Sequence, residues 1–397
     1  PTGMPTSSGV TTSTAGWSTT LYGFVEFDVI RDSTQSFTDS PANNPLLRSD
    51  ASSPAYLPRG TNPYGEQYGA THSRMMFTAR NTRFGFQLTA PEFAGIRATA
   101  TIELDFMGNQ PNNPYTKEGE VSNPNTPTET SFFTNAAVRM RHANVVLENR
   151  VVDVLLGQYY HLFGWQPHYF TGAVAFLGVP NMVFGRTPQL RLSRTVHTDP
   201  VDVQLAAAVL RPAQADSGLP DFQGGLRFSI NPWQGAHGRG SGRAMLESMS
   251  VGASGVYRRF RVAEYTNNLG DPLLATSVAT APGYGLSIDG RIPVIPISSL
   301  EDKSNALTLV GSYVVGQGIG DLYTGGLHWG APFPRPEGPQ GPMTGFYGAN
   351  VDPGLVMFDA NGVMRVVKSR SWLVGFQYFL PIANGALVLA GNHSRAE

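Results

Sequence analysis

The sequence predicts an all-β protein, a transmembrane antiparallel β-barrel of about 16 strands when complete. Three observations support this fold class. Several segments alternate apolar and polar residues with a period of two, and residues 96–106 do so without interruption. Short breaks between these segments alternate along the chain with long connections rich in Gly, Pro and Asn. Finally, there is no run of about 18 apolar residues, which excludes ordinary transmembrane helices but not membrane-crossing strands.

Composition and charge agree with this fold class. The chain has 397 residues, a normal length for one large barrel. Charged residues make up 14%, against roughly 25% in an average soluble protein, which suits an outer face that avoids charge. A net charge of −1 offers no basic surface, so no nucleic-acid partner is expected. The chain has no cysteine, which excludes disulfides and thiolate metal sites.

The first part of the chain divides into a leader and the start of the barrel. Residues 1–20 are rich in Thr, Ser, Gly and Pro and predict a flexible leader, so the barrel is expected over 21–397. Residues 21–30 alternate cleanly and predict a strand. Residues 73–90 predict another, with a change of parity near 80–83 that indicates a bulge.

The remaining strands follow in sequence. Residues 96–106 give the strongest signal, with Arg97, Glu103 and Asp105 on their polar face. Further strands are expected at residues 139–148, 151–160, 189–197, 201–211, 221–230, 247–261, 284–292, 307–315, 364–380 and 386–393. These give about thirteen strands, whereas a bacterial barrel needs an even number. Either further strands lie within residues 316–362 or the closing strands lie beyond residue 397, and we expect the second.

The connections alternate in length in a way that predicts two different ends of the barrel. Outer-membrane barrels have short periplasmic turns and long external loops. Short breaks are expected on the periplasmic side at residues 91–95, 149–150, 198–200 and 381–385. Long loops are expected outside at residues 31–72, 108–130, 161–187 and 316–362. Only the connection 231–246 is long where it should be short.

Three segments resemble Gram-negative outer-membrane porins. They are LYGFVEFDVI (21–30), TRFGFQLTAPEFAGIRATATIELDF (82–106) and RMRHANVVLENRVVDVLLGQYYHLFG (139–164). The chain is most similar to the DcaP-type porins. The resemblance implies a homotrimer of 16-stranded barrels in the outer membrane, in contact with lipid and lipopolysaccharide. It also implies an inward-folded third outer loop, here residues 161–187, and selectivity for anionic, dicarboxylate-like solutes. Residues 151–156, apolar on both faces apart from Asp153, are a candidate for part of the wall between barrels.

Arginine placement is the clearest functional signal. A charge on the lipid face costs up to about 2–4 kcal/mol at the membrane midplane, so arginines within strands are expected to face the lumen. The hypothesis is a basic ladder in the constriction, made of Arg74, Arg80, Arg97, Arg139, Arg141, Arg191 and Arg194. Opposing it are the acids Glu26, Asp28, Glu103 and Asp105, which would create a transverse field that sorts solutes by charge. Alternatively, some of these arginines lie at strand ends or only hold the loop through ion pairs.

The expected constriction loop is rich in aromatic residues and histidine. Its candidate residues are Tyr160, His161, Phe163, Trp165, His168 and Tyr169. The aromatic rings are expected to pin the loop to the barrel wall or to form interfacial girdles, and the alternative is that they line the passage. The histidines have no carboxylate nearby at ligand spacing, so no metal and no cofactor are expected.

Two other functions remain as alternatives to a porin for passive diffusion. A barrel hydrolase would need a nucleophile and a base, and Ser193 or Ser73 could pair with His72 or His197. The sequence offers no elbow motif or spacing to support such a pair, so no catalytic residue is predicted. A soluble, secreted, carbohydrate-active β-protein would use paired carboxylates, but the acids here are sparse and mostly in loops.

Overall fold

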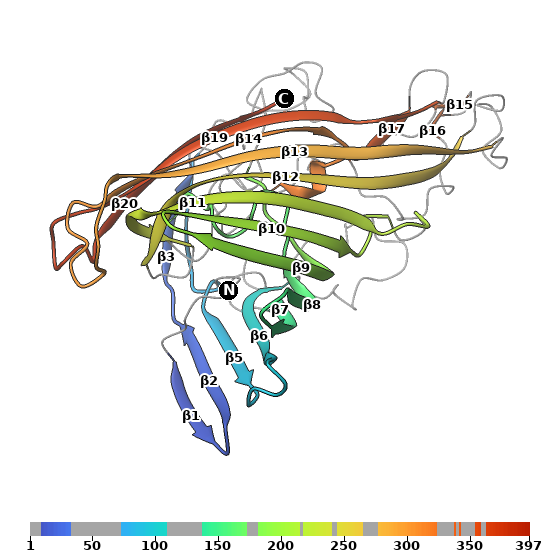
Figure 1. Ribbon diagram of the computed structural model, residues 1–397. Helices are drawn as coiled ribbons and strands as arrows, with labels where there is room; N and C mark the ends of the chain where they lie inside the picture. The colour runs from blue at the N-terminus through green and yellow to red at the C-terminus, as the bar shows by residue number, and fades with distance from the viewer. Residues whose placement is uncertain are drawn as a thin grey trace, which may run out of the picture.

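The computed structural model describes residues 9–32, 73–108, 137–172, 182–214, 217–239, 244–264, 277–323, 337–338, 341–342, 354–358 and 363–397. The dominant feature is one antiparallel sheet of 14 strands, curved into a wall (Figure 1). Its strand order is β1-β2-β5-β6-β7-β8-β9-β10-β11-β12-β13-β14-β19-β20. Within the described residues, β1 and β20 each pair with only one neighbour in this sheet. No helix in this part of the chain is long and apolar enough to cross a membrane.

The strands of the large sheet lie mostly where the alternation predicts them. In chain order they are β1 (Val10–Thr14), β2 (Trp17–Phe24), β5 (Arg83–Thr89), β6 (Arg97–Gly108), β7 (Ala137–Glu148), β8 (Asp153–Tyr160), β9 (Arg186–Thr198), β10 (Val201–Leu210), β11 (Asp221–Gly238), β12 (Ala244–Glu264), β13 (Ser277–Ile295), β14 (Leu307–Gln317), β19 (Lys368–Phe379) and β20 (Val388–Ala396). Three two-stranded sheets pair β3 (Asp28–Asp32) with β4 (Arg74–Thr78), β15 (Glu337–Gly338) with β16 (Gly341–Pro342), and β17 (Val356–Phe358) with β18 (Met364–Val366). A short 3-10 helix covers Gly320–Leu322.

The expected flexible leader is wrong for the described residues 9–20. These residues form β1 and the first half of β2, a hairpin in which Thr14 pairs with Trp17. The turn residues Ala15 and Gly16 have φ values of 50° and 80°, as a two-residue type I′ hairpin turn requires. Threonine has a high strand propensity. The prediction failed because the overall Thr, Ser, Gly and Pro content was interpreted as that of a flexible segment.

The expected strands 21–30 and 73–90 are each divided between two sheets. β2 ends at Phe24, and β3 pairs instead with β4. Between β4 and β5 the chain turns, with the N–H of Thr82 donating to the carbonyl of Ala79 at 3.1 Å. The change of parity therefore marks a turn between two strands and not a bulge within one strand.

The connection that was expected to be long, residues 231–246, is mostly strand. β11 continues to Gly238 and β12 begins at Ala244, and these two residues are paired. The register shifts between Ile230 and Gln234, where Pro232 lies in the sequence. A proline at a bulge interrupts the alternation, which is why this part of the strand was missed.

The two faces of the large sheet differ in polarity. Along β6, Ile102 is 50% exposed, whereas the adjacent Glu103 is 5% exposed. The same alternation leaves Leu192, Leu205, Phe228, Leu286 and Val374 exposed on the outer face, and Gln189, Gln204, Gln223, Ser254 and Ser287 buried on the inner face. An apolar outer wall around a polar interior is the arrangement of a membrane β-barrel.

Candidate functional site

Residues 161–172, the described start of the expected constriction loop, lie against the inner face of the sheet. The backbone N–H groups of Leu162 and Phe163 both donate to Oε1 of Gln223 on β11, each at 2.9 Å. The N–H of Gly164 donates to Oγ of Ser254 on β12 at 2.8 Å. Inward-pointing side chains of the wall thus satisfy backbone donors that a buried loop would otherwise leave unpaired.

The second half of this inner segment, as we call residues 161–172, is bound to strands farther around the sheet. The guanidinium of Arg291 on β13 donates to the carbonyl of His168 at 2.6 Å. The side-chain amide of Gln377 on β19 donates to the carbonyl of Thr171 at 3.1 Å. The inner segment therefore runs from the end of β8 across the inner face of β11 to β14 and reaches β19.

Trp165 anchors the middle of the inner segment. Its ring is 3% exposed, and its Nε1–H donates to the carbonyl of Ala253 at 3.0 Å. The ring lies directly over Gly225 and Gly252, where a Cβ would come within 2.9 and 2.7 Å of it. Only glycine leaves room for this close approach. The guanidinium of Arg227 lies 5.9 Å from the ring centroid.

The other aromatic residues of the inner segment are also buried. Phe163 is fully buried, and Tyr169 is 4% exposed with the guanidinium of Arg291 at 5.9 Å from its ring centroid. Tyr160, at the end of β8, is 7% exposed. These placements favour the interpretation that the rings hold the segment to the wall over the alternative that they line a passage.

The two histidines of the inner segment are uncharged at neutral pH. Burial lowers the pKa of His161 to about 3. Burial, with the cations Arg227, Arg239 and Arg291 nearby, lowers the pKa of His168 well below its ordinary value. In the described part of the chain, no three His, Asp or Glu residues gather as metal ligands would. That the site needs no metal stays a prediction.

Arginines and acids that were expected to oppose each other lie on the same wall and form ion pairs. Nε of Arg141 is 2.6 Å from Oε1 of Glu103, and Nη1 of Arg141 is 3.0 Å from Oδ2 of Asp105. Arg139 binds the same Asp105 at 2.5 Å. A further hydrogen bond, at 2.9 Å, links Nη2 of Arg141 to the hydroxyl of Tyr160. The predicted opposition of these charges across the lumen is therefore wrong.

The register of β6 and β7 explains this correction. Asp105 pairs with Arg139, and a register shift next to Glu103 brings Arg141 beside both acids. Alternation in the sequence places each of these side chains on the inner face, but it does not show which residues of neighbouring strands face each other. We call Glu103, Asp105, Arg139 and Arg141 the paired cluster.

The remaining acids and Arg80 lie near the turn before β5. The side-chain amide of Asn81 donates to Glu26 at 3.4 Å and to Asp28 at 3.1 Å. Arg80 is 3% exposed and donates to the carbonyl of Phe106 at 3.1 Å. The side chain of Arg74 lies outside the described residues.

Arg191 and Arg194 point to opposite faces of β9. Arg191 is 6% exposed and donates to Oε1 of Gln189 and to the carbonyl of Tyr160, at 3.0 and 2.5 Å. Arg194 is exposed and shares the outer face with Leu192. The predicted pore-lining role of Arg194 is therefore wrong, because residues three apart in a strand lie on opposite faces. Arg97 is exposed near the turn that precedes β6, as the strand-end alternative expected.

Sequence reasoning missed several inward-facing cations on the opposite part of the wall. Arg258 lies 2.7 Å from Asp221 and 2.5 Å from Asp321, and both Arg239 and Arg291 form ion pairs with Glu247. Arg186 and Arg227 are also directed inward, and Arg227 donates to Oε1 of Gln204 at 2.8 Å. Arg227 lies at the same parity as Gln223 and Ser229 in its strand, so parity was the signal that could have found it.

A cavity lies where the paired cluster, the inner segment and the opposite wall meet. Its volume is about 50 Å³, so it is narrow. It is lined by Tyr22, Arg83, Gln87, Thr101, Glu103, His142, Tyr159, Tyr160, Pro167 and Arg239. Cationic, anionic and aromatic side chains from strands β2, β5, β6, β7 and β8, from the inner segment and from the residue after β11 thus converge on one point.

This wall and its inner segment define an all-β fold dominated by one large antiparallel sheet with an apolar outer face. Among solved structures, the chain is similar to the outer membrane channel DcaP of Acinetobacter baumannii, with a TM-score of 0.50 and 17% identity over 97% of this chain and 80% of that chain. It also matches OmpT of Vibrio cholerae (9% identity, TM-score 0.35, 98% and 89% coverage) and OmpF of Salmonella typhi (10%, 0.32, 98% and 100%). No family model and no curated protein sequence matches. The likeness to DcaP therefore establishes the fold.

Proposed function

We propose that this protein is an outer-membrane porin of a Gram-negative bacterium, a water-filled channel for passive diffusion of small hydrophilic solutes. The observation that carries the proposal is the inner segment, bound by polar side chains across the inner face of a sheet whose outer face is apolar. In this proposal the barrel closes with about 16 strands and the inner segment is its inward-folded third outer loop. The proposed assembly is a homotrimer surrounded by lipid and lipopolysaccharide.

We further propose that the constriction favours anions such as small carboxylates and dicarboxylates. Three inward-facing guanidinium groups, those of Arg186, Arg191 and Arg227, form no ion pair with any carboxylate of the described residues. Nη1 of Arg186 is buried and has no hydrogen-bond partner there either. In the paired cluster, by contrast, acids neutralise the arginines. Within the part of the chain that the structure describes, these three guanidinium groups lie on β9 and β11 without a carboxylate partner, and guanidinium groups bind carboxylates strongly.

This proposal predicts a measurable change in selectivity. Replacing both Arg191 and Arg227 by glutamine should shift the reversal potential in a salt gradient towards cations, because two unneutralised lumen charges are removed. The measurement is made on the purified protein in planar bilayers, where the wild type should show stepwise, ohmic conductance and anion preference.

The matched control is Arg194→Gln, which removes a charge from the outer face of the same strand and should leave the reversal potential unchanged. Wild-type protein that inserts without conducting would contradict the porin proposal. An unchanged reversal potential in the double variant would contradict only the assignment of these two residues.

The proposed function involves no catalytic step. Ser193 and His197 are four residues apart on β9, about 13 Å at the rise of a strand, which is beyond hydrogen-bond reach. Ser73 is exposed, and His72 lies outside the described residues. A soluble carbohydrate-active protein would not expose so wide an apolar face to water. The porin should therefore require detergent and migrate as a heat-modifiable oligomer.

A further inference from the structure

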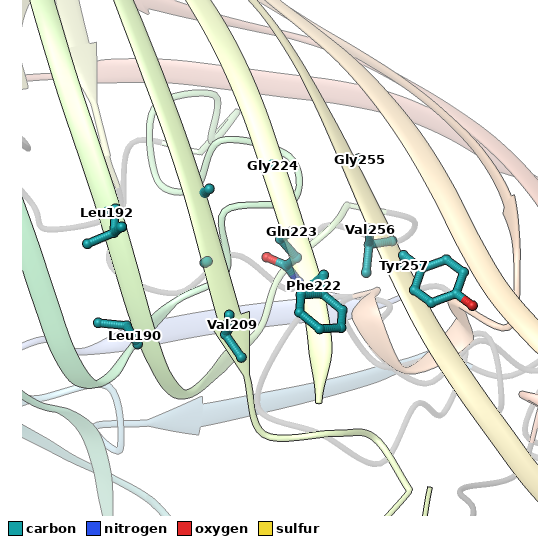
Figure 2. Close-up of a pocket in the computed structure, with 11 residues that line it drawn as sticks. Leu190, Leu192, Val209, Phe222, Gln223, Gly224, Gly255, Val256 and Tyr257 are labelled. Atoms are coloured by element: carbon teal, nitrogen blue, oxygen red, sulfur yellow. The ribbon is translucent and has the colours of Figure 1, made fainter. Parts of the chain in front are cut away.

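The two halves of the inner segment are held by different side chains of the wall. Gln223, labelled on β11 in Figure 2, and Ser254 on β12 accept hydrogen bonds from backbone N–H groups of the first half. In the second half the backbone carbonyls accept hydrogen bonds from the wall, and these are the carbonyls of His168, Phe170 and Thr171. The two halves therefore depend on different residues.

Two of the three side chains that bind these carbonyls lie next to one buried carboxylate, that of Glu247 on β12. Nη1 of Arg291 donates to the carbonyl of His168 at 2.6 Å and also contacts Oε2 of Glu247. Nε2 of His237 lies 2.7 Å from the carbonyl of Phe170, and its Nδ1 lies 3.6 Å from the same Oε2. Because a carbonyl oxygen only accepts hydrogen bonds, Nε2 carries a proton. Glu247 is thus connected to the inner segment through two side chains.

Strand pairing brings these groups together from β11, β12 and β13, which are neighbours in the sheet. Gly235 pairs with Glu247 and His237 pairs with Met245, so Glu247 and His237 are diagonal neighbours on β12 and β11. The side chains of diagonal neighbours on one face of a sheet are within reach of each other. Arg291 approaches from β13, on the other side of β12, and all three side chains are buried.

The same carboxylate also contacts a residue of the narrow cavity. Oε1 of Glu247 contacts Nη2 of Arg239, which lines this cavity together with Pro167 of the inner segment. Glu247 therefore lies between two guanidinium groups, which would repel each other without a shared anion. Within the described residues, no hydrogen bond or ion pair joins Glu247 directly to the inner segment. Its effect on the segment is exerted through other side chains.

We propose that Glu247 positions the second half of the constriction, because its carboxylate holds Arg291 and His237 where they bind the inner segment. The inference rests on the proposed function, since it takes the inner segment as the constriction. A neutral amide of the same shape does not hold two cations together, so both side chains shift when the charge is lost. Gln377 binds the carbonyls of Thr171 and Gly238 and keeps the end of the segment in place. The stretch that is released is residues 168–170.

The test is Glu247→Gln in the purified protein, with amide hydrogen exchange measured by mass spectrometry in detergent. Exchange at residues 168–170 should be at least about tenfold faster than in the wild type, because two hydrogen bonds to this stretch are weakened. Residues 162–164 should exchange at the wild-type rate, since Gln223 and Ser254 still bind them.

A second set of variants separates positioning from a general loss of stability. His237→Phe combined with Arg291→Met removes both connecting side chains and should accelerate exchange at residues 168–170 to the same extent. Adding Glu247→Gln to this double variant should produce no further acceleration, because Glu247 acts through these two residues. The double variant also tests the inference if Glu247→Gln alone does not fold.

Single-channel conductance in planar bilayers is the second readout. A channel of Glu247→Gln should conduct more than a wild-type channel, because the released stretch no longer narrows the passage. A loss of stability alone would reduce the number of channels that insert and would leave the conductance of each unchanged.

The matched control is Asp221→Asn, which neutralises another buried carboxylate of the inner face, one that binds Arg258. It should leave exchange at residues 168–170 unchanged. Wild-type exchange there in Glu247→Gln would overturn the inference, as would equal acceleration by Asp221→Asn or further acceleration in the triple variant. Wild-type protein that does not conduct would contradict the porin proposal, whereas hydrogen exchange tests the role of Glu247 without conduction, so the two failures are distinguishable.

Discussion

Replacing Arg141 by methionine is expected to lower the free energy of unfolding by about 3–5 kcal/mol, because it leaves two buried carboxylates without their shared cation. Arg141 is 1% exposed and lies 2.6 Å from Glu103 and 3.0 Å from Asp105. Its hydrogen bond to Tyr160, the last residue of β8 before the inner segment, is also lost. The change is measured by guanidinium unfolding in detergent, monitored by tryptophan fluorescence.

Two further variants separate this charge effect from a general effect of arginine removal. Arg97→Met removes an exposed arginine at the start of β6 and should change stability by no more than about 0.5 kcal/mol. Asp105 keeps Arg139 as an ion-pair partner, whereas Glu103 loses its closest cation. Adding Glu103→Gln to Arg141→Met removes the charge of Glu103 and should restore part of the loss. If Arg141→Met were as mild as Arg97→Met, the paired cluster would not be the buried network described above.

Replacing Gln223 by leucine should release the first turn of the inner segment. The carbonyl oxygen of this side chain accepts two backbone hydrogen bonds, from Leu162 and Phe163, at 2.9 Å each. Leucine accepts none, and each donor left unpaired costs about 1–3 kcal/mol. We expect faster proteolysis within the segment and a larger single-channel conductance, because a loop that leaves the inner face no longer narrows the passage.

The matched control for this prediction is Gln223→Glu. A carboxylate of nearly the same shape still accepts both hydrogen bonds, so the segment should stay in place. Equal protease sensitivity of the leucine and glutamate variants would contradict the role assigned to Gln223.

Local alternation was enough to predict most of the fold. The period of two shows which residues of β6 and β11 point inward and which point outward. A shift of one residue would place their charged side chains on the outer face, where charge is costly. The same rule could have excluded Arg194 from the lumen, since it lies three residues from Arg191. The predictions were wrong where the local composition resembled that of a loop although the residues pair as strands. The Thr-rich hairpin around Ala15 resembles a linker, and Pro232 hides the continuation of β11.

The candidate site was less predictable than the fold, since it depends on long-range register. Nothing in residues 103–105 or 139–141 indicates that they would form ion pairs with each other on one wall. The position of the Trp165 ring could not be predicted, because this requires knowing that Gly225 and Gly252 face the same point from neighbouring strands. Such contacts depend on how whole strands pair, and the sequence pattern of a single strand does not predict them.

Solutes are proposed to pass along the inner face beside the paired cluster. The sequence contains no cysteine, so single cysteines can be introduced to test this directly. Gln87 lines the narrow cavity, and its neighbour Phe86 is 42% exposed on the outer face. Single-channel current is recorded from Gln87→Cys and Phe86→Cys while a charged, water-soluble thiosulfonate is added. We expect a stepwise fall in the current of Gln87→Cys and no change for Phe86→Cys. A current that falls only for Phe86→Cys, or that stays constant when mass spectrometry shows Cys modification at position 87, would contradict it.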